Sequence, residues 1–174
     1  MKNKVIIIGA GPAGLSLACS LADTDIEITI IEKQPTKHLS SPFYDGREIA
    51  LTHFSKKILE ELGVWKRLSS KTISPIKEAK VLDGNSSYAL HFDRHKVHKK
   101  ALGYLVSNHL IRKALYQEAI TKPNINIISD TSVVNVNTGE YSAFARLSNK
   151  KKIQAPLVVA ADSRFSKIRS KMGK

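Results

Sequence analysis

Residues 5–33 read VIIIGAGPAGLSLACSLADTDIEITIIEK, and this stretch decides the fold. The all-apolar run Val5–Ile8 predicts a buried strand, and Ile26–Ile31 predicts a second strand that ends at Glu32. Between the two strands, a glycine-rich turn opens a segment in which apolar residues recur at helical spacing. The order strand, turn, helix, strand predicts the βαβ unit of a Rossmann-like α/β fold.

The three glycines of this turn have the spacing that binds a dinucleotide. Gly9 allows the tight turn, Gly11 allows the backbone to approach a pyrophosphate, and Gly14 allows close packing of helix and strand. The helix then directs unpaired N–H groups and the positive end of its dipole at the phosphates. Glu32, about twenty residues further on, can accept hydrogen bonds from an adenosine ribose. An ordinary turn between strand and helix would explain the glycines but not this acid. The predicted cofactor contacts of this segment are Gly9, Gly11, Pro12, Ala13, Gly14, Glu32 and Lys33.

The chain is strongly basic, with 28 Lys and Arg against 15 Asp and Glu in 174 residues and a formal net charge of +13. Basic residues cluster in the stretch 94–100 and again over 150–174. Such clusters suit an anionic membrane surface or a partner in a biosynthetic complex, or they form a solvated surface. They match no nucleic-acid-binding module, so we expect no nucleic-acid partner.

Three features bear on the cellular location. The N-terminus runs directly into the first strand, which predicts no signal peptide, and no apolar run approaches the ~20 residues that span a bilayer. Cys19 is the single cysteine, so no disulfide framework is expected. The histidines lack the spacing of metal ligands, so no metal site is predicted. We expect a cytoplasmic location, with peripheral attachment to a membrane as an alternative.

The rest of the chain alternates between strand-like and helix-like patterns. Loops are predicted over 33–47 and, as a polar and mobile stretch, over 93–100. Helices are predicted from the cap Thr52 to Gly63, as a short turn over 64–68, and over 108–120 and 163–171. Strands are predicted as a hairpin over 79–82 and 88–92, singly over 125–128, as an antiparallel set over 132–137, 141–147 and 151–154, and beside the first strand over 157–161.

Three further motifs carry a family resemblance: residues 45–52 read DGREIALT, residues 102–108 read LGYLVSN and residues 160–166 read AADSRFS. Together with the βαβ start and the long excursion that contains a hairpin, they resemble the FAD-dependent aromatic hydroxylases of the p-hydroxybenzoate hydroxylase fold. Within that group, the chain is most similar to the ubiquinone-biosynthesis hydroxylases of the 5-demethoxyubiquinol 5-hydroxylase (UbiM-like) type. The resemblance covers the whole chain but only about the first half of a family member's usual length.

The resemblance implies FAD as the cofactor, with its pyrophosphate at the three glycines and its ribose at Glu32. Arg47 matches the family arginine that approaches the flavin side of the cofactor, where a guanidinium offers a fixed fork of donors. Asn108 matches a position that often makes a polar contact with FAD. The alternatives are a surface loop arginine at Arg47 and a helix N-cap at Asn108.

Asp162 matches the aspartate of the family's second FAD motif. The usual residue after it is glycine, and this chain has Ser163, which restricts the backbone more and leaves the local turn open. Ser166 and Arg169 keep the later positions of the motif. The third FAD motif of the family, a Gly-Asp pair before a helix, is expected beyond residue 174, as is most of the substrate-covering sheet.

The predicted fold is therefore α/β, an incomplete p-hydroxybenzoate hydroxylase fold in an N-terminal fragment. Its parts are a Rossmann-like FAD-binding domain over 1–74 and 102–174 and a partial antiparallel substrate-domain hairpin with its loop over 75–101.

The resemblance also implies a reaction. NAD(P)H reduces FAD, and the reduced flavin uses oxygen to hydroxylate the ring of a prenylated phenol or quinol. No catalytic acid or base is predicted, and the fragment is expected to be inactive alone. Two alternatives stay open: a nonenzymatic remnant or nucleotide-binding module, and an NAD-dependent dehydrogenase, which the long excursion after Glu32 disfavours.

Overall fold

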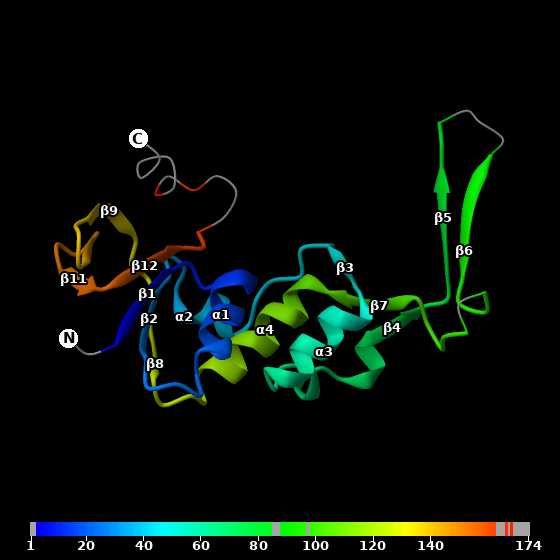
Figure 1. The fold of residues 1–174 in the computed structure, drawn as a ribbon, viewed down its shortest axis with the longest axis horizontal. Helices are drawn as coiled ribbons and strands as arrows, with labels where there is room; N and C mark the ends of the chain where they lie inside the picture. Colours follow the sequence, from blue (N-terminus) through cyan, green and yellow to red (C-terminus); the bar gives the residue numbers. More distant parts are fainter. Residues whose placement is uncertain (1–2, 85–87, 97, 163–165, 167, 169–174) are drawn as a thin grey trace. The chain divides into compact units, whose positions relative to one another are not determined.

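A computed structural model describes residues 3–84, 88–96, 98–162, 166 and 168. Its contacts divide the chain into two compact units, residues 1–43 with 112–174 and residues 44–111 (Figure 1). These units are defined by contacts within the structure. The functional domains predicted from the sequence, over 1–74 with 102–174 and over 75–101, are a different division and remain a prediction.

Four parallel strands form the central sheet of the first unit (Figure 1). They are β1 (Lys4–Ile8), β2 (Glu27–Ile31), β8 (Ile125–Ile128) and β12 (Leu157–Ala160), in the order β12-β1-β2-β8. Ile6, Ile7 and Ile8 of β1 are almost fully buried, as a strand covered on both faces requires. The strand predicted over 157–161 lies beside β1, with Val5 opposite Leu157, and this prediction is confirmed.

Helix α1 (Pro12–Ser20) follows the glycine turn and completes the predicted βαβ unit. A proline fits at its start because the first N–H groups of a helix have no partner within the helix. Leu15, Ala18 and Cys19 are buried, so the apolar face of α1 belongs to the core of the unit.

A second sheet in this unit is antiparallel and has the order β11-β10-β9. Its strands are β9 (Val133–Thr138), β10 (Ala143–Leu147) and β11 (Lys152–Ala155), which confirms the predicted antiparallel set. Ala145 and Leu147 of β10 share a buried cluster with Ile6, Ile8 and Ile31. The antiparallel sheet therefore packs on the parallel one.

Helix α2 (Thr36–Ser40) corrects the loop predicted over 33–47. It begins after Pro35, whose backbone is extended, and Leu39 anchors it with 3% of its surface exposed. A helix of five residues is too short for helical periodicity to show in the sequence, which explains the error.

The second unit contains a three-stranded antiparallel sheet with the order β3-β7-β4. The strands are β3 (Glu48–Leu51), β4 (Ile73–Ile76) and β7 (Gly103–Ser107). The sequence patterns predict neither β3 nor β4, because both are short edge strands and β4 contains Pro75, which sheets tolerate at an edge.

Helix α3 (His53–Glu61) lies in the same unit, and its predicted cap is confirmed, since the Thr52 hydroxyl accepts the Ser55 N–H. The predicted turn after it is the 3₁₀ helix η1 (Trp65–Arg67), and a second 3₁₀ helix, η2 (Ser70–Thr72), precedes β4. Helix α4 (Asn108–Ala119), also predicted, begins directly after β7 and continues into the first unit.

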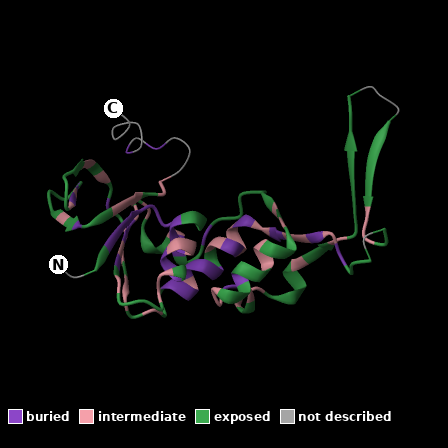
Figure 2. Cartoon of the chain, viewed as in Figure 1, coloured by how far each residue is buried: buried purple, intermediate pink, exposed green. Residues whose placement is uncertain are grey.

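Strands β5 (Glu78–Leu82) and β6 (Ala89–Asp93) form the predicted antiparallel hairpin. Its register pairs Ala79 with Phe92 and Val81 with Leu90, so these apolar side chains share one face. Figure 2 shows that both strands are almost entirely exposed.

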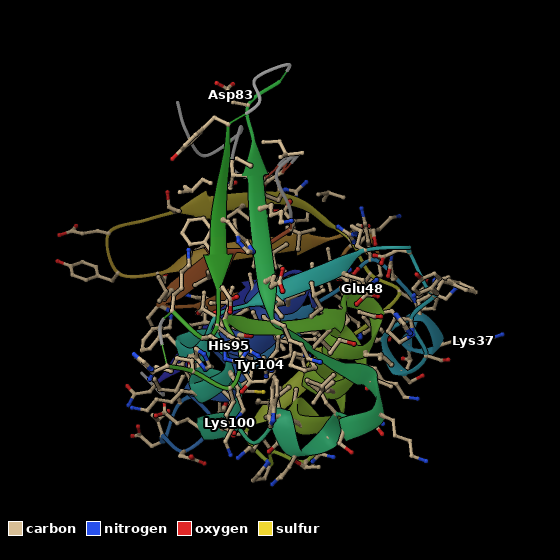
Figure 3. The ribbon with its side chains drawn as sticks, turned by 90° about the vertical axis from the view of Figure 1, so that its right-hand side faces the viewer. Lys37, Glu48, Asp83, His95, Lys100 and Tyr104 are labelled. Atoms are coloured by element: carbon tan, nitrogen blue, oxygen red, sulfur yellow. The ribbon has the colours of Figure 1, made fainter. Side chains whose placement is uncertain are left out.

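The basic stretch that follows the hairpin turns back at the base of the strands, where Figure 3 places His95 and Lys100, with Asp83 at the other end. Local hydrogen bonds close this turn: the His95 N–H donates to Asp93 Oδ1 at 2.7 Å, and Arg94 Nη1 donates to the Lys100 carbonyl at 3.1 Å. The predicted loop over 93–100 is confirmed from residue 94 onward for the residues that the structure describes, whereas Asp93 ends strand β6; its mobility remains a prediction.

The helix predicted over 163–171 lies outside the described residues, apart from the buried Ser166 and Ile168. The same holds for Ser163, Arg169 and most of the basic cluster near the C-terminus. Across the described residues, no helix combines the length and the apolar character that crossing a membrane requires.

Candidate nucleotide-binding site

Close backbone contacts within the fold require glycine at two positions of the turn. Gly9 has a φ of +106°, and a Cβ there would lie 2.6 Å from the Ala161 carbonyl oxygen at the end of β12. A Cβ on Gly14 would lie only 2.0 Å from the Gly9 carbonyl oxygen. Strand, turn and helix therefore approach so closely that neither position accepts a side chain.

Gly11 differs from these two glycines. Its φ of −76° and ψ of 179° suit any residue, and a Cβ there would meet no atom of the described residues within 4 Å. It is the N-cap of α1, so the open space lies where the helix presents its first N–H groups. No acidic residue occupies the first turn of this helix. An anion fits there, because the unpaired N–H groups and the positive end of the helix dipole are uncompensated.

The Glu32 carboxylate is fixed by the backbone at the end of β2. Its Oε2 accepts the Ala10 N–H at 2.8 Å, and its Oε1 accepts the Gln34 N–H at 2.9 Å. Each carboxylate oxygen has a further lone pair, so both can also accept a hydroxyl. The acid predicted to bind a ribose is thus held against the glycine turn.

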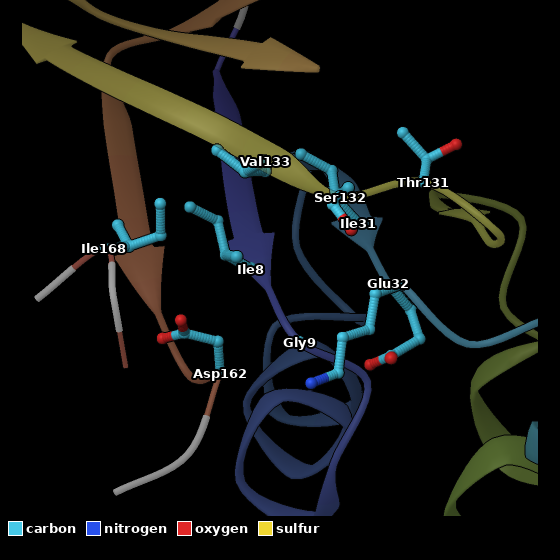
Figure 4. Close-up of a pocket in the computed structure, with 10 residues that line it drawn as sticks. Ile8, Gly9, Ile31, Glu32, Thr131, Ser132, Val133, Asp162 and Ile168 are labelled. Atoms are coloured by element: carbon cyan, nitrogen blue, oxygen red, sulfur yellow. The ribbon is translucent and has the colours of Figure 1, made fainter. Parts of the chain in front are cut away.

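A cavity of about 560 Å³ lies at the carboxyl ends of β1, β2 and β12 (Figure 4). Its lining residues are Ile8, Gly9, Ile31, Glu32, Lys33, Thr131, Ser132, Val133, Asp162 and Ile168. Ligands of open α/β sheets bind outside the carboxyl ends of the strands, which is where this cavity lies.

Asp162 enters the cavity with an unsatisfied acceptor. Its Oδ1 is buried, and none of the described residues donates a hydrogen bond to it. Because buried polar atoms are nearly always paired, this oxygen is suited to a donor from a ligand, such as a ribose hydroxyl. The open space at Gly11, the fixed Glu32 and the unpaired Asp162 oxygen together fit a dinucleotide.

A second polar cluster, in the other unit, contains Arg47 and Asn108. Asp45 Oδ2 accepts hydrogen bonds from Arg47 Nε at 2.9 Å, from Arg47 Nη2 at 2.5 Å and from Asn108 Nδ2 at 2.7 Å. These bonds, that of Arg47 first and that of Asn108 second, lower the pKa of Asp45 from 3.8 to about 2. Asn108 is buried at the start of α4, whereas most of the Arg47 side chain is exposed.

The predicted site residues therefore fall into two groups. Gly9, Gly14, Glu32, Lys33 and Asp162 lie at one edge of the parallel sheet, with Gly11, Pro12 and Ala13 at the start of α1. Arg47 and Asn108 belong to the second unit and are joined by Asp45.

Sequence reasoning missed Asp45 and the segment 131–133 that lines the cavity. The position of that segment just after β8 could have indicated it, because ligands of parallel sheets bind at the carboxyl ends of the strands.

One group of possible metal ligands lies on the hairpin, where no metal site was predicted. Ligand atoms of Glu78, His91 and Asp93 lie within 4.8 Å of one another. His91 Nε2 is 3.2 Å from Glu78 Oε2, so a hydrogen bond across the hairpin accounts for their proximity.

The chain is similar in sequence to two ubiquinone hydroxylases. Ubiquinone hydroxylase UbiM of Neisseria meningitidis is 44% identical over 177 residues, which cover 99% of this chain and 38% of that protein. Ubiquinone hydroxylase UbiL of Rhodospirillum rubrum is 30% identical over 169 residues, which cover 97% of this chain and 39% of that protein. The resemblance to ubiquinone-biosynthesis hydroxylases is confirmed, and the chain spans less than half the length of these relatives.

Solved structures confirm the fold. The p-nitrophenol 4-monooxygenase PnpA from Pseudomonas putida superposes with a TM-score of 0.78 at 18% identity, over 97% of this chain and 43% of that one. A 2-methyl-3-hydroxypyridine-5-carboxylic acid oxygenase gives a TM-score of 0.76 at 21% identity, over 99% of this chain and 43% of that one. These matches show an α/β fold of the p-hydroxybenzoate hydroxylase type, present in part. The sequence profile of the FAD binding domain family matches residues 2–174. Together with the glycine turn and its two acids, this match shows that the chain belongs to the FAD binding domain family.

Proposed function

We propose that this chain binds FAD as the cofactor-binding part of a monooxygenase that hydroxylates the ring of a prenylated phenol or quinol in ubiquinone biosynthesis. NAD(P)H is the proposed reductant. The observation that carries the proposal is the open space at Gly11, a position where the described residues make no contact that would require glycine. The substrate class rests on the 44% identity to a ubiquinone hydroxylase.

The residues of the chain bind and orient the cofactor in this proposal. The N–H groups at the start of α1 hold the pyrophosphate, and Glu32 accepts hydrogen bonds from the adenosine ribose. Asp162 Oδ1 accepts a further ligand hydroxyl. Arg47 and Asn108 serve the flavin side. FAD, when bound, supplies the oxygen chemistry of the hydroxylation.

Cofactor binding and hydroxylation are separate parts of the proposal. The chain spans 38% of UbiM, so we assign cofactor binding to residues 1–174 and hydroxylation to a protein with the full length of a family member. A nucleotide-binding module without hydroxylase activity is the alternative. A full-length protein that contains this chain and oxidises NAD(P)H with ring hydroxylation would support the monooxygenase.

Titration calorimetry with ADP and FAD tests the binding part. Glu32→Ala removes charge-assisted bonds and should weaken both ligands by roughly 1.5 to 3 kcal/mol. Gly11→Val should weaken both as well, because its side chain fills the space that the pyrophosphate needs. Thr52→Ala, a helix cap in the other unit, is the control and should leave both affinities unchanged. Equal affinity of wild type and both site variants would exclude this site.

We also propose peripheral attachment to an anionic membrane through the basic stretch over 93–100. Lys99 and Lys100 are exposed there, and a prenylated substrate resides in a lipid phase. Each Lys near an anionic bilayer contributes on the order of 1 kcal/mol, so sedimentation with anionic liposomes should fall with salt. The double variant Lys99→Glu with Lys100→Glu should lose binding. Equal binding to neutral liposomes would contradict this proposal.

A further inference from the structure

The Asp45 carboxylate accepts hydrogen bonds from two predicted cofactor contacts, Arg47 and Asn108. Its Oδ2 accepts from Arg47 Nε, Arg47 Nη2 and Asn108 Nδ2, at 2.9, 2.5 and 2.7 Å. Its Oδ1 accepts the Arg47 backbone N–H at 3.3 Å. One carboxylate thus joins two residues, 47 and 108, that are far apart in the sequence.

These bonds fix the direction of the guanidinium. Nε and Nη2 form one edge of the planar group, and both donate to the same oxygen of Asp45. The other edge, formed by Nη1 and Nη2, therefore faces away from Asp45 and keeps donors for a planar or anionic partner. Arg47 is 66% exposed, so in the absence of Asp45 this long side chain would sample many rotamers.

The backbone around the cluster is also set. The Asn108 N–H donates to the Arg47 carbonyl at 2.9 Å, next to the pair Glu48 and Ser107 that begins the ladder of β3 and β7. Gly46 has a φ of +70°, which turns the chain so that the Asp45 carboxylate returns to residue 47. The sheet, the turn and the helix start thus place all three side chains together.

We propose that Asp45 is a positioning residue that holds Arg47 and Asn108 ready for the flavin side of FAD. The inference rests on the proposed function and deepens it. Asp45 acts through Arg47 and Asn108 and does not itself touch the cofactor. Its carboxylate reduces the ordering that these side chains must undergo when FAD binds.

A purely structural role makes a different prediction. If Asp45 only closed its loop, its removal would lower stability and leave the relative affinities for FAD and ADP unchanged. ADP lacks the flavin, so the ratio of the two dissociation constants isolates the contribution of the flavin side.

The test measures FAD and ADP dissociation constants for wild type, Asp45→Ala, Arg47→Ala and the double variant. Asp45→Ala should raise the FAD constant about tenfold and leave the ADP constant within about twofold. In the Arg47→Ala background, Asp45→Ala should weaken FAD binding by less than it does in wild type, because only its effect through Asn108 is left and residues that act through one another are not additive. Asp93→Ala, which also removes a carboxylate that accepts a backbone N–H two residues further on, is the matched control and should change neither constant.

The measured constants distinguish a positioning role of Asp45 from a purely structural one. If wild type binds both ligands and Asp45→Ala leaves the FAD constant unchanged, or if its effect multiplies with that of Arg47→Ala, the positioning role is wrong while FAD binding stands. If wild type binds neither ligand, the proposed function and this inference both fail. Should Asp45→Ala not fold, Asp45→Asn keeps the shape and one acceptor oxygen, and it should show a smaller loss confined to FAD.

Discussion

Alanine substitution of the three turn glycines separates what the fold requires from what the ligand requires. At Gly14, a Cβ would lie 2.0 Å from the Gly9 carbonyl oxygen and 3.2 Å from Ile7 Cγ2. Helix α1 would have to move by about 1 Å to relieve the first contact, against a buried core. We expect Gly14→Ala to lower the free energy of unfolding by about 3 kcal/mol or more.

Gly9→Ala meets two obstacles. A φ of +106° is unfavourable for any residue with a side chain, and the new Cβ would lie 2.6 Å from the Ala161 carbonyl oxygen. The strained backbone alone costs on the order of 1 to 3 kcal/mol. The close contact adds to this, so the total loss of stability should be similar to that of Gly14→Ala.

Gly11→Ala should affect binding rather than folding. Its backbone angles are ordinary, and the new methyl would meet no atom of the part of the chain that the structure describes within 4 Å. The poorer N-cap is offset by the reduced freedom of the unfolded chain, so stability should change by no more than about 0.5 kcal/mol. The methyl occupies space that a pyrophosphate needs, and ADP affinity should fall at least tenfold, about 1.4 kcal/mol.

Urea unfolding followed by circular dichroism gives the free energies of unfolding, and titration calorimetry gives the affinities. We expect Gly11→Ala to be as stable as wild type but to bind ADP weakly, and Gly14→Ala to be unstable. If Gly11→Ala lost as much stability as Gly14→Ala, or kept full ADP affinity, the division of roles would be refuted.

Further predictions concern single side chains. The pKa of Asp45 is lowered from 3.8 to about 2, so its charge contributes stability above pH 4 that is lost as the pH falls toward 2. In the variant Arg47→Ala, the titration of the Asp45 carboxyl followed by NMR should have a midpoint nearer 3.8. Thr52→Ala removes the cap of α3 and should lower the free energy of unfolding by about 1 kcal/mol in urea titrations. Leu157 is 54% exposed on the edge strand β12, so Leu157→Lys should reduce turbidity and sedimentation on concentration, and unchanged aggregation would show that another surface associates. Asp162→Ala removes a buried unpaired oxygen, and it should raise stability without ligand by up to about 1 kcal/mol while weakening FAD binding; a drop in stability would contradict this account.

The parallel sheet could be predicted because two of its strands, β1 and β12, carry apolar runs. Both Val5–Ile8 and Leu157–Ala160 have the apolar pattern of strands in a parallel sheet, and their pairing follows from the βαβ rule and the family resemblance. The run 157–160 forms the edge strand β12, so it is less buried than β1. Strands β3 and β4 carry no such signal. They lie at the edges of a small sheet with one side exposed, and their pairing with β7 depends on contacts far along the chain.

The candidate site was predictable where its parts are local. The glycines and Glu32 lie within 24 residues, and their spacing is typical of a turn that binds a dinucleotide. Asp45 gave no comparable signal, because its importance comes from Asn108, which reaches it only after β3 and β7 have paired. The segment 131–133 lines the cavity for the same kind of reason, through backbone bonds that tie Asp130 and Thr131 to residues 34 and 32.

Glu32 and Asp162 follow two strands of the same sheet, β2 and β12, yet their carboxylates differ in hydrogen bonding. Both oxygens of Glu32 accept backbone N–H groups, so this acid is oriented before any ligand arrives. Asp162 Oδ1 is buried without a donor among the described residues, which is unfavourable for the fold. A ligand hydroxyl would remove that penalty at Asp162 and would only add a bond at Glu32. We therefore expect Glu32 to select the ligand and Asp162 to couple ligand binding to the stability of the first unit.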